Sequence, residues 1–275
     1  QHPQAAQIHA AAQALGFKVG FLGEAANSVG GYLAGLPHEG NVDSLLEKRS
    51  FVLLNCEPEL DFADTHAATE AMRRADFVVQ LSAFRTGLDY AHALLPVAPF
   101  TETAGTFVSM EGRVQSFHAT VKPLGEARPA WKVLRVLGSL LGRPGMELDT
   151  IEQVRAACLG DGDVTKMLSN AIEIDHKISP EKADGIQRIA DVPIYFADPL
   201  VRRSAPLQQT PDAEPPKARI NPRLAQKLGV AAGQPVRVNG AQLAAAVEEG
   251  IPDGCVRVAP APRSAPGVGA MFGAL

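Results

Sequence analysis

The chain has 275 residues, of which 46% are hydrophobic and 20% are charged, and this length and composition predict a globular protein of two domains. The formal net charge of −4 excludes the strongly basic class of proteins that bind nucleic acid or anionic membranes. No run approaches the roughly 18 uninterrupted apolar residues that a bilayer-spanning helix needs, so we expect no direct insertion into a membrane.

The N-terminal part of the chain alternates predicted helices and strands. It begins at Gln1 without the basic and apolar segments of a signal peptide, and we expect it to be a piece of a longer polypeptide. Helices are predicted over Ala5–Leu15 and Thr65–Ala75, the second with Asp64 as its N-cap. Apolar runs predict one strand and then two buried strands: Phe17–Leu22, Phe51–Asn55 and Phe77–Leu81. This alternation predicts a parallel sheet with right-handed crossovers, and hence an α/β domain over residues 1–146.

Further along, the chain changes from helical to β patterning. A helix is predicted over Trp131–Leu141, where Gly142 and Pro144 end it. Residues 147–190 are more charged and predict a connecting segment with one or two helices. After Pro193 the sequence is rich in proline and then in short valine-bearing runs between glycine-rich turns, which is typical of β-structure. These runs are Pro235–Asn239, Gln242–Val247 and Cys255–Val258, within a β-domain over residues 191–275.

Two stretches of the sequence carry a family resemblance. The first runs from Leu94 to Gly142 and contains the segment GTFVSMEGR, a Gly-Glu-Ala-Arg-Pro loop and the tryptophan-bearing helix; the second runs from Arg219 to Val256. In order and spacing they resemble the molybdopterin oxidoreductase superfamily. Within it, they are most similar to the family of the large subunit of bacterial respiratory complex I, the NADH-quinone oxidoreductase. The resemblance implies a parallel-sheet α/β domain of the molybdopterin oxidoreductase type, followed by a smaller double-psi β-barrel domain that resembles the molybdopterin dinucleotide-binding domain.

The resemblance also identifies candidate cofactor-binding residues, because in the family this first stretch lies beside the pterin cofactor. The candidates are Gly105, Thr106, Ser109, Glu111, Gly112 and Arg113. Active molybdopterin enzymes usually have Asn where this chain has Ser109, and a serine hydroxyl cannot offer the paired donor and acceptor of an amide. Two interpretations stay open: a vestigial pterin loop, or a structural turn pinned by an ion pair between Glu111 and Arg113. We favour the structural turn.

Other candidate sites have weaker support. Cys56, Cys158 and Cys255 are far apart in the sequence, and the seven histidines show no paired spacing, so we expect neither a metal site nor catalytic residues. The loop Gly23–Gly31 follows a predicted strand but lacks both nucleotide-binding fingerprints. It is either a vestigial nucleotide pocket or, as we favour, a plain strand-to-helix connection.

Two charged features have structural as well as functional interpretations. Arg202 and Arg203 are adjacent, and they either pair with carboxylates of a partner or of the first domain, or form a solvated pair. Asp61 and Asp64 flank one turn, where helix capping is a sufficient role for both.

The preferred interpretation is a structural and assembly region of the large peripheral-arm subunit of complex I, without a cofactor of its own. Complex I transfers electrons from NADH to quinone, coupled to proton translocation. The resemblance implies iron–sulfur clusters in a preceding part of the subunit and other peripheral-arm subunits as partners. It also implies a location on the cytoplasmic side of the inner membrane. The alternative is a cofactor-holding fragment of a molybdenum-dependent oxidoreductase such as formate dehydrogenase.

Overall fold

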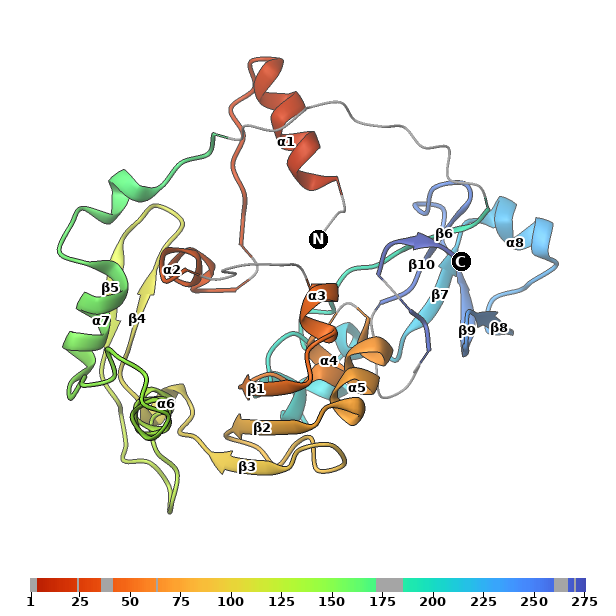
Figure 1. The fold of residues 1–275 in the computed structure, drawn as a ribbon. Helices are drawn as coiled ribbons and strands as arrows, with labels where there is room; N and C mark the ends of the chain where they lie inside the picture. The colour runs from red at the N-terminus through yellow and green to blue at the C-terminus, as the bar shows by residue number, and fades with distance from the viewer. Residues whose placement is uncertain are drawn as a thin grey trace. The chain divides into compact units, whose positions relative to one another are not determined.

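The computed structural model describes residues 4–23, 25–35, 42–62, 64–171, 185–259, 267–269 and 271–275. The chain forms two compact units (Figure 1). The N-terminal unit consists of Gln4–Cys56 and Ala75–Ile178, and the C-terminal unit includes Glu57–Arg74 and Ser179–Leu275. These bounds do not coincide with the expected domains 1–146, 147–190 and 191–275. Residues 57–74 join the C-terminal unit, and most of the expected connecting segment belongs to the N-terminal one.

A three-stranded parallel sheet lies in the N-terminal unit, as the alternating pattern predicts. Its strands are β1 (Ser50–Leu54), β2 (Phe77–Ser82) and β3 (Ala93–Pro96), in the order β1-β2-β3. The two strands predicted to be buried are β1 and β2, and all the pairings are parallel.

The expectation that β1 is covered on both faces is wrong for the described residues. Val52 and Leu54 point to one face of the sheet and are 54% and 42% exposed, whereas Leu53 on the opposite face is buried. On β2, Val78 and Gln80 are fully buried. One face of the sheet is therefore buried, and the β1 part of the other is open.

The strand predicted over Phe17–Leu22 is not formed. This segment follows helix α1 (Ala5–Ala14) and has no regular structure. Phe21 stacks on His9 with ring centroids 4.6 Å apart, while Phe17 and Leu22 are exposed. An apolar run becomes a strand only when its backbone finds a partner, and the described strands pair with one another instead.

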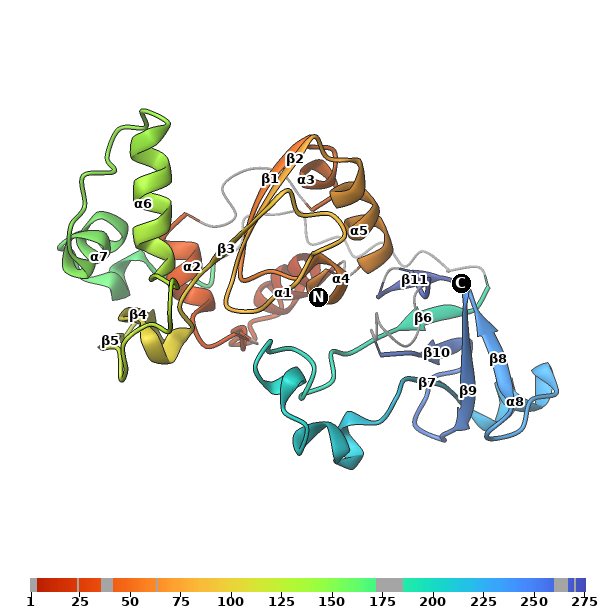
Figure 2. The same cartoon turned by 90° about the horizontal axis from the view of Figure 1, so that it is seen from below.

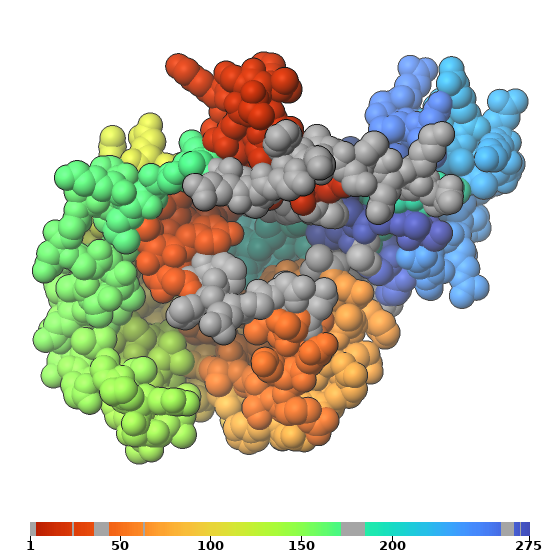
Figure 3. All heavy atoms as spheres, turned by 45° about the horizontal axis from the view of Figure 1, so that its top comes forward, coloured from red at the N-terminus to blue at the C-terminus, as the bar shows by residue number. Residues whose placement is uncertain are grey.

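A β-hairpin and two helices complete the part of the N-terminal unit that matters for the site. The hairpin is β4 (Gly105–Val108) with β5 (Val114–Phe117), and the predicted helix with Trp131 is α6 (Ala130–Leu140). Helix α7 (Ile151–Leu159) begins with a capping box between Thr150 and Gln153. The α6–α7 segment (green) forms a continuous surface in the space-filling view (Figure 3). The remaining elements are α2 (Ser28–Leu33), α3 (Val42–Leu46), η1 (Phe100–Glu102) and η2 (Val164–Met167).

The C-terminal unit contains a six-stranded mixed sheet with the order β11-β6-β10-β7-β9-β8 (Figure 2). The pairs β6–β10 and β7–β9 are parallel, and the other three are antiparallel. The strands are β6 (Gln187–Ile189), β7 (Lys217–Ile220), β8 (Pro235–Val238), β9 (Ala241–Val247), β10 (Cys255–Arg257) and β11 (Gly273–Ala274). The three predicted valine-bearing runs become β8, β9 and β10. The double-psi barrel stays a prediction, and β6 begins before the expected boundary at residue 191.

Helices of the C-terminal unit begin and end at clear signals in the sequence. Asp64 caps α5 (Thr65–Arg74) by accepting from the Ala67 N–H at 3.0 Å, which confirms its predicted role. Asn221 caps α8 (Pro222–Leu228) by accepting from the Leu224 N–H at 2.7 Å. The other short helices are α4 (Pro58–Asp61), η3 (Val201–Arg203), η4 (Leu207–Gln209) and η5 (Pro211–Ala213).

The core of the C-terminal unit is aliphatic. It lies between α8 and the sheet and consists of Ala218, Ile220, Leu224, Ala225, Val238, Ala241, Leu243, Val256, Val258 and Val268. The strands contribute to it through alternate residues, as β9 alternates buried with exposed positions along most of its length.

Candidate functional site

The six candidate residues all fall in the β4–β5 hairpin. Gly105 and Thr106 begin β4, Ser109 opens the turn, and Arg113 closes it just before β5. The Ser109 N–H donates to the Arg113 carbonyl at 3.0 Å, and the Ser109 carbonyl accepts from the Gly112 N–H at 2.9 Å. The Ser109 hydroxyl accepts from the Arg113 N–H at 3.2 Å. Ser109 therefore closes the turn through its backbone and its side chain together.

Both candidate glycines are required by the space around the hairpin. A Cβ at Gly105 would lie 2.6 Å from the ring of Phe117, on the paired strand. Gly112 has a φ of 81°, and a Cβ there would lie 2.9 Å from Leu168 and 3.0 Å from Thr165. Glycine at these two positions is explained by close packing and by a left-handed backbone, without any ligand.

The hairpin is joined to the Gly23–Gly31 loop, in which residue 24 lies outside the described residues. Asn27 makes the connection, because its Oδ1 accepts from the Val108 N–H at 2.8 Å and its Nδ2 donates weakly to the Thr106 carbonyl at 3.4 Å. The Met110 sulfur accepts from the Gly23 N–H at 3.2 Å. A side chain at Gly30 would collide with that of Asn27. The structure thus brings together the two loops that the sequence identified separately.

Asn27 itself was not a candidate from the sequence. The local signal was an amide side chain inside a loop of small residues, but its partners on β4 are about 80 positions away. The Gly23–Gly31 loop was expected to connect a strand to a helix. The helix is present, because the loop leads into α2, but among the described residues no strand precedes the loop.

A chain of hydroxyls extends from the hairpin to α7. The hydroxyls of Thr106 and Ser116 face each other across the two strands at 3.0 Å. Arg155 on α7 donates to the Ser116 hydroxyl at 2.7 Å. This network connects the hairpin to α7, and in it the Thr106 hydroxyl is hydrogen-bonded to Ser116.

Several polar groups of the turn are engaged within the protein. Its Ser109 hydroxyl and backbone groups are engaged within the turn, and the Thr106 carbonyl faces Asn27. Glu111 and Arg113 are both exposed, and no ion pair joins them, although both lie in the described part of the chain. The expected ion pair is thus not what pins this turn; the Ser109 bonds take that role.

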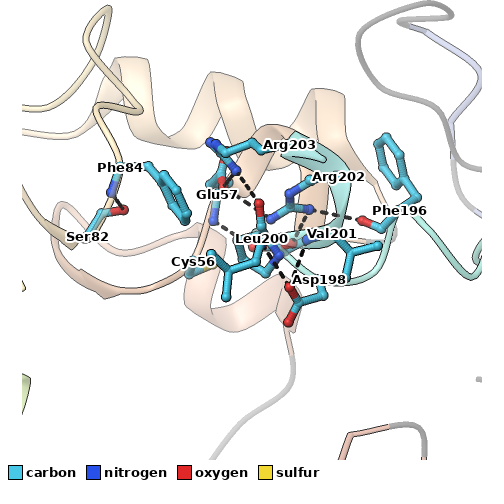
Figure 4. Close-up of polar contacts among 12 residues, drawn as sticks. Cys56, Glu57, Ser82, Phe84, Phe196, Asp198, Leu200, Val201, Arg202 and Arg203 are labelled. Carbon is cyan, nitrogen blue, oxygen red and sulfur yellow. Dashed lines mark hydrogen bonds and ion pairs between the residues drawn. The ribbon is translucent and has the colours of Figure 1, made fainter. Parts of the chain in front are cut away.

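A buried charge cluster lies in the C-terminal unit (Figure 4). Arg203 forms a two-pronged pair with Glu57 at 2.8 Å to each carboxylate oxygen, and Arg202 reaches Glu57 at 3.2 Å and Asp61 at 2.9 Å. The side chains of Arg202 and Glu57 are 4% and 2% exposed. We call this group of Glu57, Asp61, Arg202 and Arg203 the arginine clamp. Of the interpretations of the two arginines, the structure shows pairing with carboxylates. Glu57 and Asp61 lie within the expected domain 1–146, but they belong to the same compact unit as the arginines.

The arginine clamp keeps its carboxylate ionised. Burial by itself raises the pKa of Glu57, but the hydrogen bond from Arg203 and the charges of both arginines outweigh this effect and lower the pKa overall. Asp61 has a double role, since its second oxygen accepts from the Glu57 N–H at 2.7 Å. Glu57 was missed in the sequence because its partners lie 145 and 146 positions downstream.

A second buried cation, Arg188, lies on β6. Its guanidinium donates to the carbonyls of Gly269 at 2.6 Å and Val258 at 3.1 Å. Burial lowers the pKa of Arg188 to about 10, although the charge of Asp64 opposes this shift. Arg188 stays charged at neutral pH and ties β6 to the glycine-rich turn at Gly267–Gly269.

Trp131 is half-buried rather than fully buried. It borders an open cavity of about 510 Å³, together with Pro129, Lys122 and Thr150. The hydroxyl of Thr150 accepts from the Gln153 N–H and caps α7.

The described residues contain no group of three or more His, Cys, Asp or Glu side chains that could hold a metal ion. Cys158 is exposed, and Cys56 and Cys255 are half-buried and form no disulfide. Within the same described ranges, no helix is both long enough and apolar enough to cross a membrane.

Comparisons with known proteins identify a family for this chain. Residues 1–140 match the family described as molybdopterin oxidoreductase. A protein of Staphylococcus aureus (strain USA300) named "Putative formate dehydrogenase" is 30% identical over 106 residues, which are 38% of this chain and 10% of that protein. A protein of the same name from the bovine strain RF122 is 37% identical over 73 residues, 26% of this chain and 7% of that protein. The matched region is thus about a tenth of the length of these relatives.

One solved structure shows the same fold. Acetylene hydratase from Pelobacter acetylenicus superposes with a TM-score of 0.54 and 16% identity, over 82% of this chain and 40% of that chain. At this identity the likeness concerns the fold alone.

Proposed function

The chain belongs to the molybdopterin oxidoreductase family, and we propose that it serves as a structural and assembly region of a larger oxidoreductase rather than as a catalytic centre. The observation that carries this proposal is the hydrogen bonding of Ser109. The side chain that would have to face a pterin closes its own turn instead, and the neighbouring Thr106 carbonyl faces Asn27. A bound pterin would supply two-electron redox chemistry at a metal, whereas these residues supply packing and hydrogen bonds to one another.

Two parent enzymes are compatible with this role, and a different observation favours each. The names of the staphylococcal relatives favour a molybdenum-dependent formate dehydrogenase, and the comparisons therefore support that alternative better than complex I. In that parent, the chain would help to hold the cofactor from a distance, through domains that support its pocket.

Complex I is favoured by Ser109, which stands where active molybdopterin enzymes usually have Asn. In that parent, the chain would pack against the cluster-bearing part of the large subunit and other peripheral-arm subunits, on the cytoplasmic side of the inner membrane. Electron transfer from NADH to quinone would then pass through iron–sulfur clusters outside this chain.

The test is a pair of substitutions in the oxidoreductase that contains this chain. Ser109→Asn introduces the amide, and Ser109→Ala removes only the hydroxyl that accepts from the Arg113 N–H. We expect Ser109→Asn to leave turnover per assembled enzyme unchanged, with either formate or NADH as electron donor. A several-fold change in that turnover, together with a change in bound molybdenum or in the fluorescence of the oxidised pterin, would refute the structural role. The donor that the enzyme oxidises identifies the parent.

A further inference from the structure

The connection between the first two strands of the parallel sheet belongs to the other unit. β1 ends at Leu54 and β2 begins at Phe77. The two strands are parallel neighbours, so the chain between them must cross back to the end of the sheet where β1 began. Here the connection contains α4 and α5, and residues Glu57–Arg74 are part of the C-terminal unit. The sheet and its own crossover are therefore stabilised by different parts of the chain.

The residues that follow β1 are held in place by hydrogen bonds to β2. The Asn55 N–H donates to the Leu81 carbonyl at 2.8 Å, and the Gln80 side chain donates to the Cys56 carbonyl at 3.0 Å, which fixes both residues to β2. The next residue is Glu57, whose carboxylate is held by Arg202 and Arg203. Asn55 also has a positive φ of 48°, so the backbone turns sharply at this point.

The arginine clamp is a strong polar attachment for this crossover. The Glu57 carboxylate is buried, and the charge-assisted, two-pronged contact to it comes from Arg203, which is 28% exposed and 146 positions away in the sequence. Removal of Arg203 leaves the buried Glu57 carboxylate with the contact from Arg202 at 3.2 Å, so its charge is less well compensated and the segment that carries it moves toward water. The segment in question is the crossover.

We propose that Arg202 and Arg203 anchor the β1–β2 crossover, so that the stability of the N-terminal parallel sheet is controlled by the C-terminal unit. The arginine clamp acts here by positioning the crossover. Loss of the pair loosens α4, and through the fixed residues Asn55 and Cys56 it loosens the end of β1 and its pairing with β2.

Hydrogen exchange read by mass spectrometry tests this coupling on the full chain. The variant is Arg203→Ala, and the matched control is Arg223→Ala, which removes an exposed pair with Asp253 in the same unit. Arg203→Ala should speed exchange at least ten-fold in peptides that cover β1 and β2. The peptide that covers α6, in the same unit as the sheet but outside the crossover, should keep its protection in both variants.

Two results would overturn the proposal. In one, Arg203→Ala deprotects only residues 57–74 and leaves β1 and β2 as they are in the parent chain. In the other, α6 loses protection as much as β1 does, which would mean general unfolding instead of transmission through the crossover. If Arg203→Ala does not accumulate as folded protein, Arg203→Lys keeps the charge without the two-pronged geometry and is judged by the same criteria.

Discussion

Asn27 offers the sharpest test of how the two candidate loops are joined. Asn27→Ala removes the acceptor of the Val108 N–H, which lies on a strand residue that is almost completely buried. A buried donor left without a partner costs about 1–3 kcal/mol, and the long bond to the Thr106 carbonyl adds little. We therefore expect Asn27→Ala to destabilise the N-terminal unit by about 2 kcal/mol.

The assay is urea unfolding followed by tryptophan fluorescence, because the single tryptophan, Trp131, reports on the unit that contains Asn27. With an m-value of about 2 kcal/mol/M, the midpoint should fall by roughly 1 M. Asn27→Asp keeps an acceptor for the Val108 N–H but turns a second oxygen toward the Thr106 carbonyl. Its urea midpoint should therefore lie between that of Asn27→Ala and that of the unchanged chain. Ser28→Ala, which removes a hydroxyl bonded to an exposed loop carbonyl, is the control. Equal midpoints for Asn27→Ala and the unchanged chain would show that Asn27 does not hold the hairpin to the loop.

Three other substitutions test further features of the fold. Gly112→Ala should lower the thermal midpoint because it combines a left-handed backbone with a Cβ against Leu168; an unchanged midpoint would mean that the turn relaxes freely. Trp131→Ala should cost about 1–3 kcal/mol in urea unfolding followed by circular dichroism, less than for a fully buried tryptophan, because the ring is half-buried; an unchanged free energy of unfolding would mean that the ring does not pack against its own unit. The lowered pKa of Glu57 means that its stabilisation is fully present above about pH 4.5 and is lost as the pH falls through the folded-state value. Unfolding midpoints measured from pH 7 to pH 3 should show this loss, and Glu57→Gln should flatten that part of the profile.

Local patterns in the sequence predicted the elements that local physics determines. The buried strand β2, the helix α6 and the Asp64 cap follow from apolar runs and from capping chemistry within a few residues. The same reasoning failed for Phe17–Leu22, because an apolar run does not show whether a pairing partner exists. It also did not identify β6, a strand of only three residues.

The candidate site was predictable in its position but not in its bonding. The family resemblance located the hairpin, and the glycines were recognised as backbone requirements. Asn27 and Glu57 were missed because their partners lie about 80 and 146 positions away, and neither residue has a distinctive neighbour in sequence. Contacts of that range depend on the whole fold and leave no trace in a local window.

The structural and assembly role is tested most directly by comparing the amount of assembled oxidoreductase with its turnover. Arg203→Ala breaks the two-pronged pair with the buried carboxylate of Glu57, whereas Arg223→Ala breaks only an exposed pair with Asp253. Both substitutions are introduced into the enzyme that contains this chain. The assembled enzyme is quantified on a native gel, and formate or NADH oxidation is normalised to that amount. We expect less assembled enzyme for Arg203→Ala and the same turnover per assembled enzyme. A normal amount of enzyme with collapsed turnover would contradict the structural role.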